Sequence, residues 1–281
     1  MSIAGGYYNA VLAAQQAGCD TVQLFTKNNA QWRAKAITDD DVGLFSDSLR
    51  TAAVQTPIAH ACYLINLASP DATLWKKSID ALAEELRRCE ALGLKYLVVH
   101  PGAHIESGEE AGLKRVAQAL DEVHAQTRGT RTQVLLEITA GQGSSLGHRF
   151  EHLAQILHLA SDPDRLGVCF DTCHAFAAGY PLGTEAEYRA TMRRLNRTVG
   201  LKLVKAMHLN DSKRELGSRV DRHEHIGRGK LGLEPFRFLL NDARFRRVPM
   251  YLETPKGKEL GQDLDVINLR TLRSLLGRSV R

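Results

Sequence analysis

The sequence has no long apolar run. No stretch approaches the 18 or more consecutive apolar residues that a membrane-spanning helix needs. Met1 is followed by Ser-Ile-Ala-Gly-Gly, whereas a secretory signal would begin with a basic region followed by an apolar one. These two absences predict a cytoplasmic protein that does not bind a membrane.

Cysteine is scarce and unpaired. The chain has five cysteines, an odd number, and no Cys-x-x-Cys motif, which disfavours both a disulfide framework and a thiolate zinc site. Cys169 and Cys173 end an apolar run, where we interpret them as packing residues. Histidine is more informative, because the chain has 11 copies.

The chain also lacks a Ser/Pro-rich linker, and its composition does not change along its length. Hydrophobic residues make up 43% and charged residues 25%, as in globular proteins. The formal net charge of +5 modestly favours a polyanionic partner such as nucleic acid.

Short apolar runs alternate with longer amphipathic stretches over the whole chain. The runs typical of buried strands are residues 21–25, 56–59, 96–99, 133–136, 166–170, 204–207 and 248–252. The stretches with helical spacing include residues 10–17, 74–92, 109–126, 149–159, 185–199 and 234–242. This repeated βα pattern predicts an α/β fold in which residues 1–281 form a single domain, a TIM (β/α)8 barrel. Only seven strands are found, so the first strand is apparently absent or truncated at the N-terminus.

Six potential metal ligands stand at or just after the carboxyl ends of successive predicted strands. They are His60, His100, Glu137, Asp171, His208 and Glu253. A barrel brings all such strand ends together around one mouth. So many carboxylates and imidazoles in one place would repel and lose hydration unless cations compensated them, which predicts a metal site.

Two further groups extend this set. His174 follows Asp171 by three residues, and Asp221 and His223 lie two apart, so both point the same way in an extended segment. On spacing alone, His225 could replace His223. Nine ligands exceed the needs of one ion, and mixed imidazole and carboxylate ligation suits Zn²⁺ or Mn²⁺.

Five segments together resemble the endonuclease IV family. They are 100–102 (HPG), 137–143 (EITAGQG), 171–179 (DTCHAFAAG), 208–211 (HLND) and 217–223 (GSRVDRH). The resemblance runs from Gly5 to about Glu253. It implies a zinc-dependent apurinic/apyrimidinic endonuclease with a (β/α)8 barrel and three zinc ions.

The resemblance also implies how the ligands divide among the ions. One zinc would be held by His60, His100 and Glu137, with Glu137 bridging to a second. The second would be held by Asp171, His208 and Glu253, and the third by His174, Asp221 and His223, which selects His223 over His225. Manganese is possible at one site.

The implied reaction is hydrolysis of the phosphodiester bond 5′ to an abasic site in damaged double-stranded DNA, leaving a 3′-hydroxyl and a 5′-deoxyribose phosphate. Clustered metal ions suit this chemistry because they activate water and neutralise charge on the phosphate. Glu137 is the predicted catalytic residue, since it could orient or deprotonate the attacking water. We expect a monomer.

The resemblance further implies DNA contacts by Tyr63, Leu64, Lys27, Asn28, Gln31 and Arg222. Tyr63 and Leu64 would fill the gap left by an extruded nucleotide. Ala30 departs from the family, which often has Arg at this position. A second departure is the strand ending in Gly-Ala-His that normally precedes the segment matched by residues 2–6.

Two alternatives remain open. A xylose-isomerase-like sugar isomerase would use the same barrel and strand-end ligands around one or two ions, but it would leave His174, Asp221 and His223 without a metal. A metal-stabilised protein that binds DNA lesions without cutting them is the other. A nicking assay combined with metal analysis separates all three.

Overall fold

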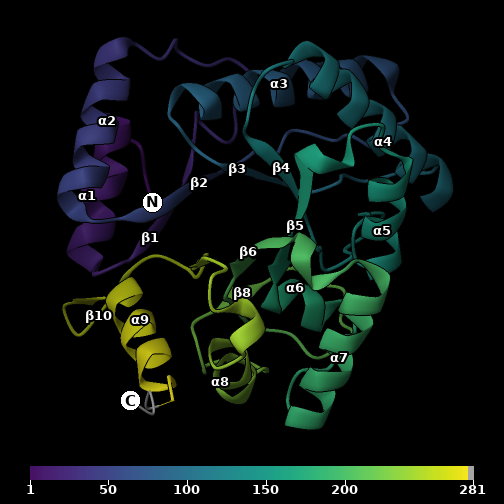
Figure 1. The fold of residues 1–281 in the computed structure, drawn as a ribbon. Helices are drawn as coiled ribbons and strands as arrows, with labels where there is room; N and C mark the ends of the chain where they lie inside the picture. Colours follow the sequence, from purple (N-terminus) through teal and green to yellow (C-terminus); the bar gives the residue numbers. More distant parts are fainter. Residues whose placement is uncertain (278–281) are drawn as a thin grey trace.

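The computed structural model describes residues 1–277. Their main sheet has seven parallel strands, which together with the surrounding helices form an incomplete barrel (Figure 1). The strands are β1 (Thr21–Phe25), β2 (Gln55–His60), β3 (Tyr96–Val99), β4 (Gln133–Glu137), β5 (Leu166–Asp171), β6 (Val204–His208) and β9 (Met250–Tyr251). Each strand pairs with the next along the chain. The outer strands β1 and β9 are joined by the Thr21 hydroxyl, which donates to the Met250 carbonyl at 3.2 Å. The predicted TIM-type α/β fold with seven strands is confirmed.

Helices alternate with the strands and lie around the outside of the sheet (Figure 1). They are α1 (Tyr7–Ala17), α2 (Asp39–Ala52), α3 (Ala72–Ala91), α4 (Glu109–Gln126), α5 (Phe150–Leu159), α6 (Thr172–Ala177), α7 (Glu185–Thr198), α8 (Glu234–Leu240) and α9 (Leu264–Ser274). Helices α2, α6 and α9 were not predicted. The first of these has a recognisable start, because Thr38 and Asp41 form a capping box in which each side chain accepts the other's backbone N–H.

The barrel interior explains how the strands present their polar ends. One apolar cluster contains Ile58, Val98, Leu135, Cys169, Ala206 and Tyr251, each from a different strand. Side chains two positions apart on a strand point to the same face. The residues two positions further on are the six predicted strand-end ligands. The buried cluster therefore forms a floor beneath them, while a larger apolar cluster lies between the sheet and the helices.

Short elements complete the described chain. The antiparallel ribbons β7 (Asp211–Ser212) with β8 (His223–Glu224), and β10 (Lys258–Glu259) with β11 (Gln262–Asp263), follow the later strands. The 3-10 turns are η1 (Pro163–Arg165), η2 (Leu201–Leu203) and η3 (Ala243–Phe245). No helix within residues 1–277 has the length and hydropathy required to span a bilayer. A single domain over residues 1–281 stays a prediction, whose last four residues lie outside the described range.

Candidate metal centre

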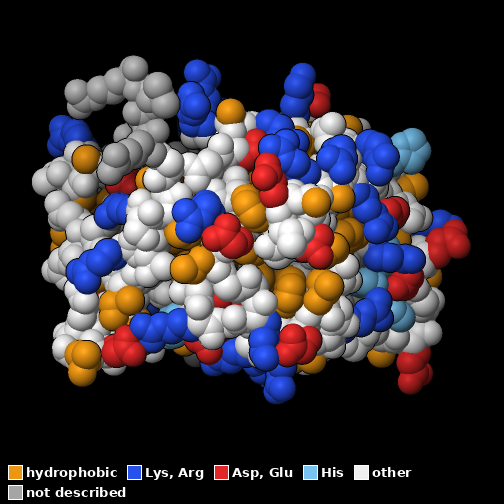
Figure 2. Space-filling view, turned by 90° about the horizontal axis from the view of Figure 1, so that it is seen from below, with side chains coloured by type: hydrophobic (Ala, Val, Ile, Leu, Met, Phe, Trp, Pro, Cys, Tyr) orange, Lys and Arg blue, Asp and Glu red, His pale blue; other side chains and the backbone are white. Residues whose placement is uncertain are grey.

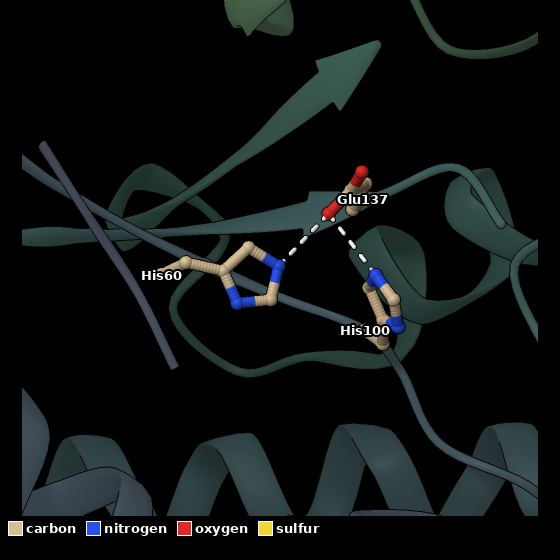
Figure 3. Close-up of side chains that lie close together, drawn as sticks. All are labelled: His60, His100 and Glu137. Carbon is tan, nitrogen blue, oxygen red and sulfur yellow. Dashed lines mark hydrogen bonds and ion pairs between the residues drawn. The ribbon is translucent and has the colours of Figure 1, made fainter. Parts of the chain in front are cut away.

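The first group of ligands meets above the floor at strands β2, β3 and β4. The Nε2 atoms of His60 and His100 each lie 3.2 Å from the same oxygen of Glu137, Oε2 (Figure 3). His60 and Glu137 are fully enclosed, whereas the His100 side chain is 32% exposed. This group therefore opens to the mouth on the His100 side.

The second group surrounds His208 at the end of β6. Its Nδ1 atom lies 2.9 Å from Oε1 of Glu137 and 3.2 Å from Oε2 of Glu253. Asp171 Oδ2 is 3.8 Å from the same nitrogen. The two oxygens of Glu137 thus face different groups, which is the arrangement expected of a bridging carboxylate.

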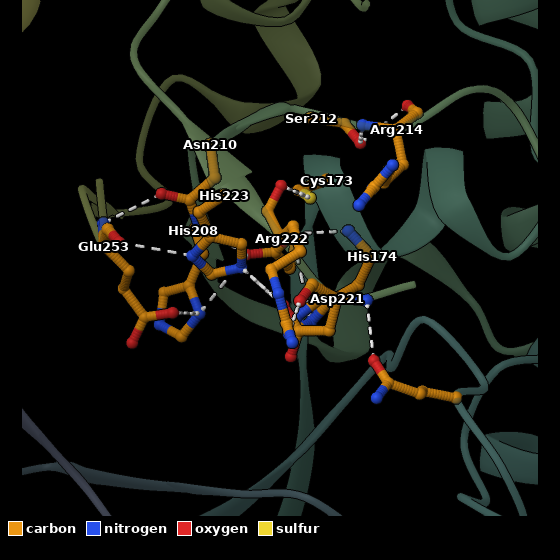
Figure 4. A network of polar contacts seen from close by, with 12 residues as sticks. Cys173, His174, His208, Asn210, Ser212, Arg214, Asp221, Arg222, His223 and Glu253 are labelled. Carbon is orange, nitrogen blue, oxygen red and sulfur yellow. Dashed lines mark hydrogen bonds and ion pairs between the residues drawn. The ribbon is translucent and has the colours of Figure 1, made fainter. Parts of the chain in front are cut away.

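The third group lies next to the other two, with His174 on α6, His223 on β8 and Asp221 in the loop before β8 (Figure 4). Asp221 carboxylate oxygens lie 3.2 Å from His174 Nε2 and 3.4 Å from His223 Nε2. Those two nitrogens are 3.3 Å apart. His225 points elsewhere, with its Nδ1 atom accepting from the Asn268 amide at 3.1 Å. The structure therefore brings all nine predicted ligands together, with His223 in place.

Four of these histidines have the same orientation. One ring nitrogen of each lies within hydrogen-bond distance of an oxygen that can only accept: His60 Nδ1 and Ala61 O (2.7 Å), His174 Nδ1 and Ile138 O (2.9 Å), His223 Nδ1 and Glu253 O (3.2 Å), His208 Nε2 and Gln23 Oε1 (2.7 Å). That nitrogen carries the proton, so the other one directs its lone pair into the centre. Metal-binding histidines are held in this way.

The charges in the centre favour cations. Burial lowers the pKa of His174, but Asp171, Asp221 and Glu137 outweigh it and hold that pKa well above its ordinary value. Burial raises the pKa of Glu137, but the imidazoles of His208 and His100 hold it well below its ordinary value. A bound divalent cation would take the place of the protons on these imidazoles and would supply the positive charge that the carboxylates attract. The donor set, with lone pairs of His174 and His223 facing each other across an ion-sized gap, fits such a cation.

Three amide side chains around the centre were not predicted from the sequence. Gln23 accepts from His208 and donates to Glu253 Oε1 at 2.6 Å. The Asn210 amide donates to Asp171 Oδ2 at 2.6 Å, and its oxygen accepts from the backbone of Glu253 at 2.9 Å (Figure 4). Gln142 accepts from the backbone of Asp221. Position was the available signal for Asn210, which lies just after the end of β6, whereas Gln23 lies in the middle of β1.

A cavity of about 360 Å³ opens at the mouth over the first group. Its lining includes His60, Tyr63, Asn66, His100, Gln142 and Asp221. Tyr63 is 61% exposed, and its ring lies 5.5 Å from the ring of His60. Leu64 is half-buried and packs against the core. Tyr63 is thus exposed at the mouth beside the first group, and Leu64 follows it in the chain.

The loop after β1 differs from the sequence prediction at Lys27. Its side chain is buried, with Nζ lying 3.5 Å from the buried carboxylate of Glu85 and donating to the Gln31 carbonyl at 2.6 Å. Because its ammonium is enclosed within the protein, Lys27 holds this loop in place and is not available to a DNA phosphate. Asn28 and Gln31 are exposed, as a DNA contact requires.

Basic residues are spread widely over the surface. On the face that carries α7, α8 and α9, Lys and Arg side chains are interspersed with acidic and apolar ones (Figure 2). Near the third group, Arg222 is exposed, whereas Arg228 pairs with Glu259 and Lys230 with Glu215. Net charge alone therefore does not locate a DNA surface, and Arg222 stays a candidate because it adjoins Asp221.

Comparison with known proteins identifies the family. Residues 11–270 match the family model described as "Xylose isomerase-like TIM barrel". "Probable endonuclease 4" of Chloroflexus aggregans is 51% identical over 276 residues, covering 98% of this chain and 96% of that protein. The protein of the same name from Citrifermentans bemidjiense is 49% identical over 276 residues, covering 98% and 97%.

A solved structure agrees with these relatives. The crystal structure of endonuclease IV from Thermus thermophilus superposes with a TM-score of 0.86 at 37% identity, covering 98% of this chain and 96% of that one. The resemblance drawn from the sequence motifs is confirmed, and with it the prediction of a nuclease. The chain therefore belongs to the endonuclease IV family.

Proposed function

We propose that this endonuclease hydrolyses the phosphodiester bond 5′ to an abasic site in double-stranded DNA, leaving a 3′-hydroxyl and a 5′-deoxyribose phosphate. The observation that carries the proposal is the shared orientation of four histidines, whose lone pairs face carboxylates of the centre. Those of His60 and His208 face Glu137, and those of His174 and His223 face Asp221. Family membership supports DNA as the substrate.

The nine ligands would hold three zinc ions, with manganese possible at one site. His60, His100 and Glu137 form one set, and Asp171, His208 and Glu253 form a second that Glu137 joins. His174, Asp221 and His223 form the third. When bound, these ions supply positive charge that stabilises the phosphate oxygens as the bond is cleaved.

Glu137 has the central role among the protein groups. It is fully buried, and its two oxygens are oriented by imidazoles on opposite sides. We assign it to orient the attacking water and to accept its proton. The water oxygen bonds to phosphorus, the bond from phosphorus to the 3′ oxygen breaks, and that oxygen leaves with a proton as the 3′-hydroxyl.

Tyr63 would stand against the DNA at the mouth, where the side chain is exposed above the ligands. Leu64, Asn28, Gln31 and Arg222 complete the proposed contacts. We further propose that the protein acts as a monomer in the cytoplasm.

The test combines metal analysis with a nicking assay. Purified protein should hold close to three ions per chain and should cut a duplex containing one abasic-site analogue, while leaving the undamaged duplex intact. Retention of metal without cleavage at low salt and with added zinc would favour a protein that binds lesions only. One or two ions per chain, with isomerisation of a sugar, would favour the isomerase.

A further inference from the structure

Asp221 is the most exposed of the nine ligands, and it lies neither at the end of a barrel strand nor within a helix or the β7–β8 ribbon. Its side chain is 41% exposed, compared with 16% for His223 and 19% for Glu253. It lies in the loop between β7 and β8, in the segment 213–222. Something other than a regular element must therefore fix its position.

A second loop, 138–149 between β4 and α5, makes one contact with Asp221 itself and one with Arg219, two residues before it. The Gln142 side-chain oxygen accepts from the backbone N–H of Asp221 at 3.1 Å. The Arg219 guanidinium donates to Nε2 of His148 at 2.7 Å. Nδ1 of His148 is directed to the Ser145 carbonyl at 3.0 Å, so this nitrogen carries the proton and Nε2 is free to accept.

Arg219 needs such a partner because its backbone is in the left-handed region, with φ at +55°. This conformation is disfavoured for a residue with a Cβ and persists only where neighbouring groups hold it. Its N–H donates to the Ala177 carbonyl at 2.9 Å, and its side chain reaches His148. The turn that leads into Asp221 is thus held through both the backbone and the side chain of Arg219.

His148 is itself firmly placed. It is 5% exposed, and its ring packs edge-on against His152 with centroids 4.7 Å apart. Gly141 packs so closely against it that an added Cβ would lie 2.7 Å from His148 atoms. The carboxylate of Glu109 lies 3.7 Å from its Nε2 atom. The loop therefore offers two acceptors to this turn, the exposed Gln142 at Asp221 itself and the buried His148 at Arg219, two residues earlier.

We propose that Gln142 and His148 are positioning residues that set the Asp221 carboxylate for the third metal ion, His148 acting through Arg219. This inference rests on the proposed function. It also assigns Arg219 to holding the turn that precedes Asp221. Partners of this kind typically contribute about ten- to hundredfold to metal affinity or activity.

The experiment compares the variants Gln142→Leu and His148→Phe with a control, His158→Phe, which makes the same change at an exposed position on α5. Metal content is measured after dialysis against a graded chelator, and the visible spectrum is recorded after cobalt replacement. The two variants should release one ion at about ten- to hundredfold lower chelator concentration than the control, while the other two ions stay bound. The kcat for nicking should fall with little change in KM.

A double-mutant cycle tests the route through Arg219. If His148 acts through it, His148→Phe and Arg219→Ala should weaken the same ion, and combining them should add little. His148→Gln, which keeps an acceptor, should restore part of the affinity.

The outcomes separate this inference from the proposed function. Wild-type protein that does not hold three ions or does not nick abasic DNA contradicts the proposed function. If the wild type does both, the positioning role is overturned by variants that hold all three ions as tightly as the control. It is also overturned by variants that lose all three in parallel, because that marks a general loosening of the fold.

Discussion

The metal centre, meaning the nine proposed ligands, and the DNA-facing rim, meaning residues 26–33 with Tyr63 and Leu64, are held in different ways. Six of the nine proposed ligands lie at or just after the carboxyl ends of strands, above a buried apolar floor. The rim consists of loops, whose side chains lie where local contacts direct them. A ligand at a strand end can therefore be located from its place in the repeat, whereas a rim residue cannot, as Lys27 shows.

Glu137→Gln tests the metal centre most severely and should have the largest effect. The variant keeps the size of the side chain but loses its charge and its ability to accept a proton. We expect kcat for nicking to fall by about a thousandfold or more, with most of the affinity for abasic duplex retained. Steady-state kinetics and a binding titration measure the two quantities. Turnover equal to that of the wild type would rule out the role assigned to Glu137.

Lys27→Met tests the rim. Removing the ammonium leaves the buried Glu85 carboxylate without its cation, although Thr26 and the backbone of Cys62 still donate to it. Breaking a buried pair in this way should lower the free energy of unfolding by about 3 kcal/mol, measured by urea titration. Asn28→Ala is the matched surface change and should alter stability by less than about 0.5 kcal/mol. A weakened affinity for DNA at unchanged stability would restore the original prediction for Lys27.

Gln23→Leu tests how far the centre depends on its amide partners. The change removes the acceptor for His208 Nε2 and the donor to Glu253. We expect metal affinity or kcat to fall about ten- to hundredfold. Gln133→Leu is the control, because the Gln133 side chain donates to the Asp164 carbonyl at the start of β4, the end of that strand away from the proposed ligands. Equal metal affinity and equal kcat in the two variants would show that His208 does not need Gln23 as a partner.

His124, which is not one of the proposed ligands, gives the smallest expected effect, a change in how stability depends on pH. Burial, followed by the charge of Arg165, lowers the pKa of His124 to about 4. Since the unfolded chain has the higher pKa, near 6.5, it binds more protons between the two values, and acid destabilises the fold. Stability should be complete above pH 6.5 and should fall by about 1 kcal/mol by about pH 5.5. His124→Gln should remove this part of the pH dependence, and an unchanged profile would contradict the assignment.

The sequence allowed the barrel and six of the nine proposed ligands to be predicted from regular repetition, whereas His174, Asp221 and His223 were predicted from short motifs and from the resemblance. Strand, helix and ligand recur once per βα unit, and the motif around Asp171 is long. The burial of Lys27 depends on Glu85, which is distant in sequence, and no periodicity indicates that they meet. Helix α6 was missed because it is short and lies inside that motif, although Asp171 caps it by accepting from the backbone of His174.

Glu137 has a further consequence for how the protein would take up metal. Oε2 faces His60 and His100, while Oε1 faces His208 and His174. A first ion would orient this carboxylate for the next, so the binding equilibria are linked and the affinity of each site depends on the occupancy of the other. A zinc titration should then show cooperative filling of these two sites, so that protein holding only one of the two ions is scarce. The third site, formed by His174, Asp221 and His223, should fill and empty separately.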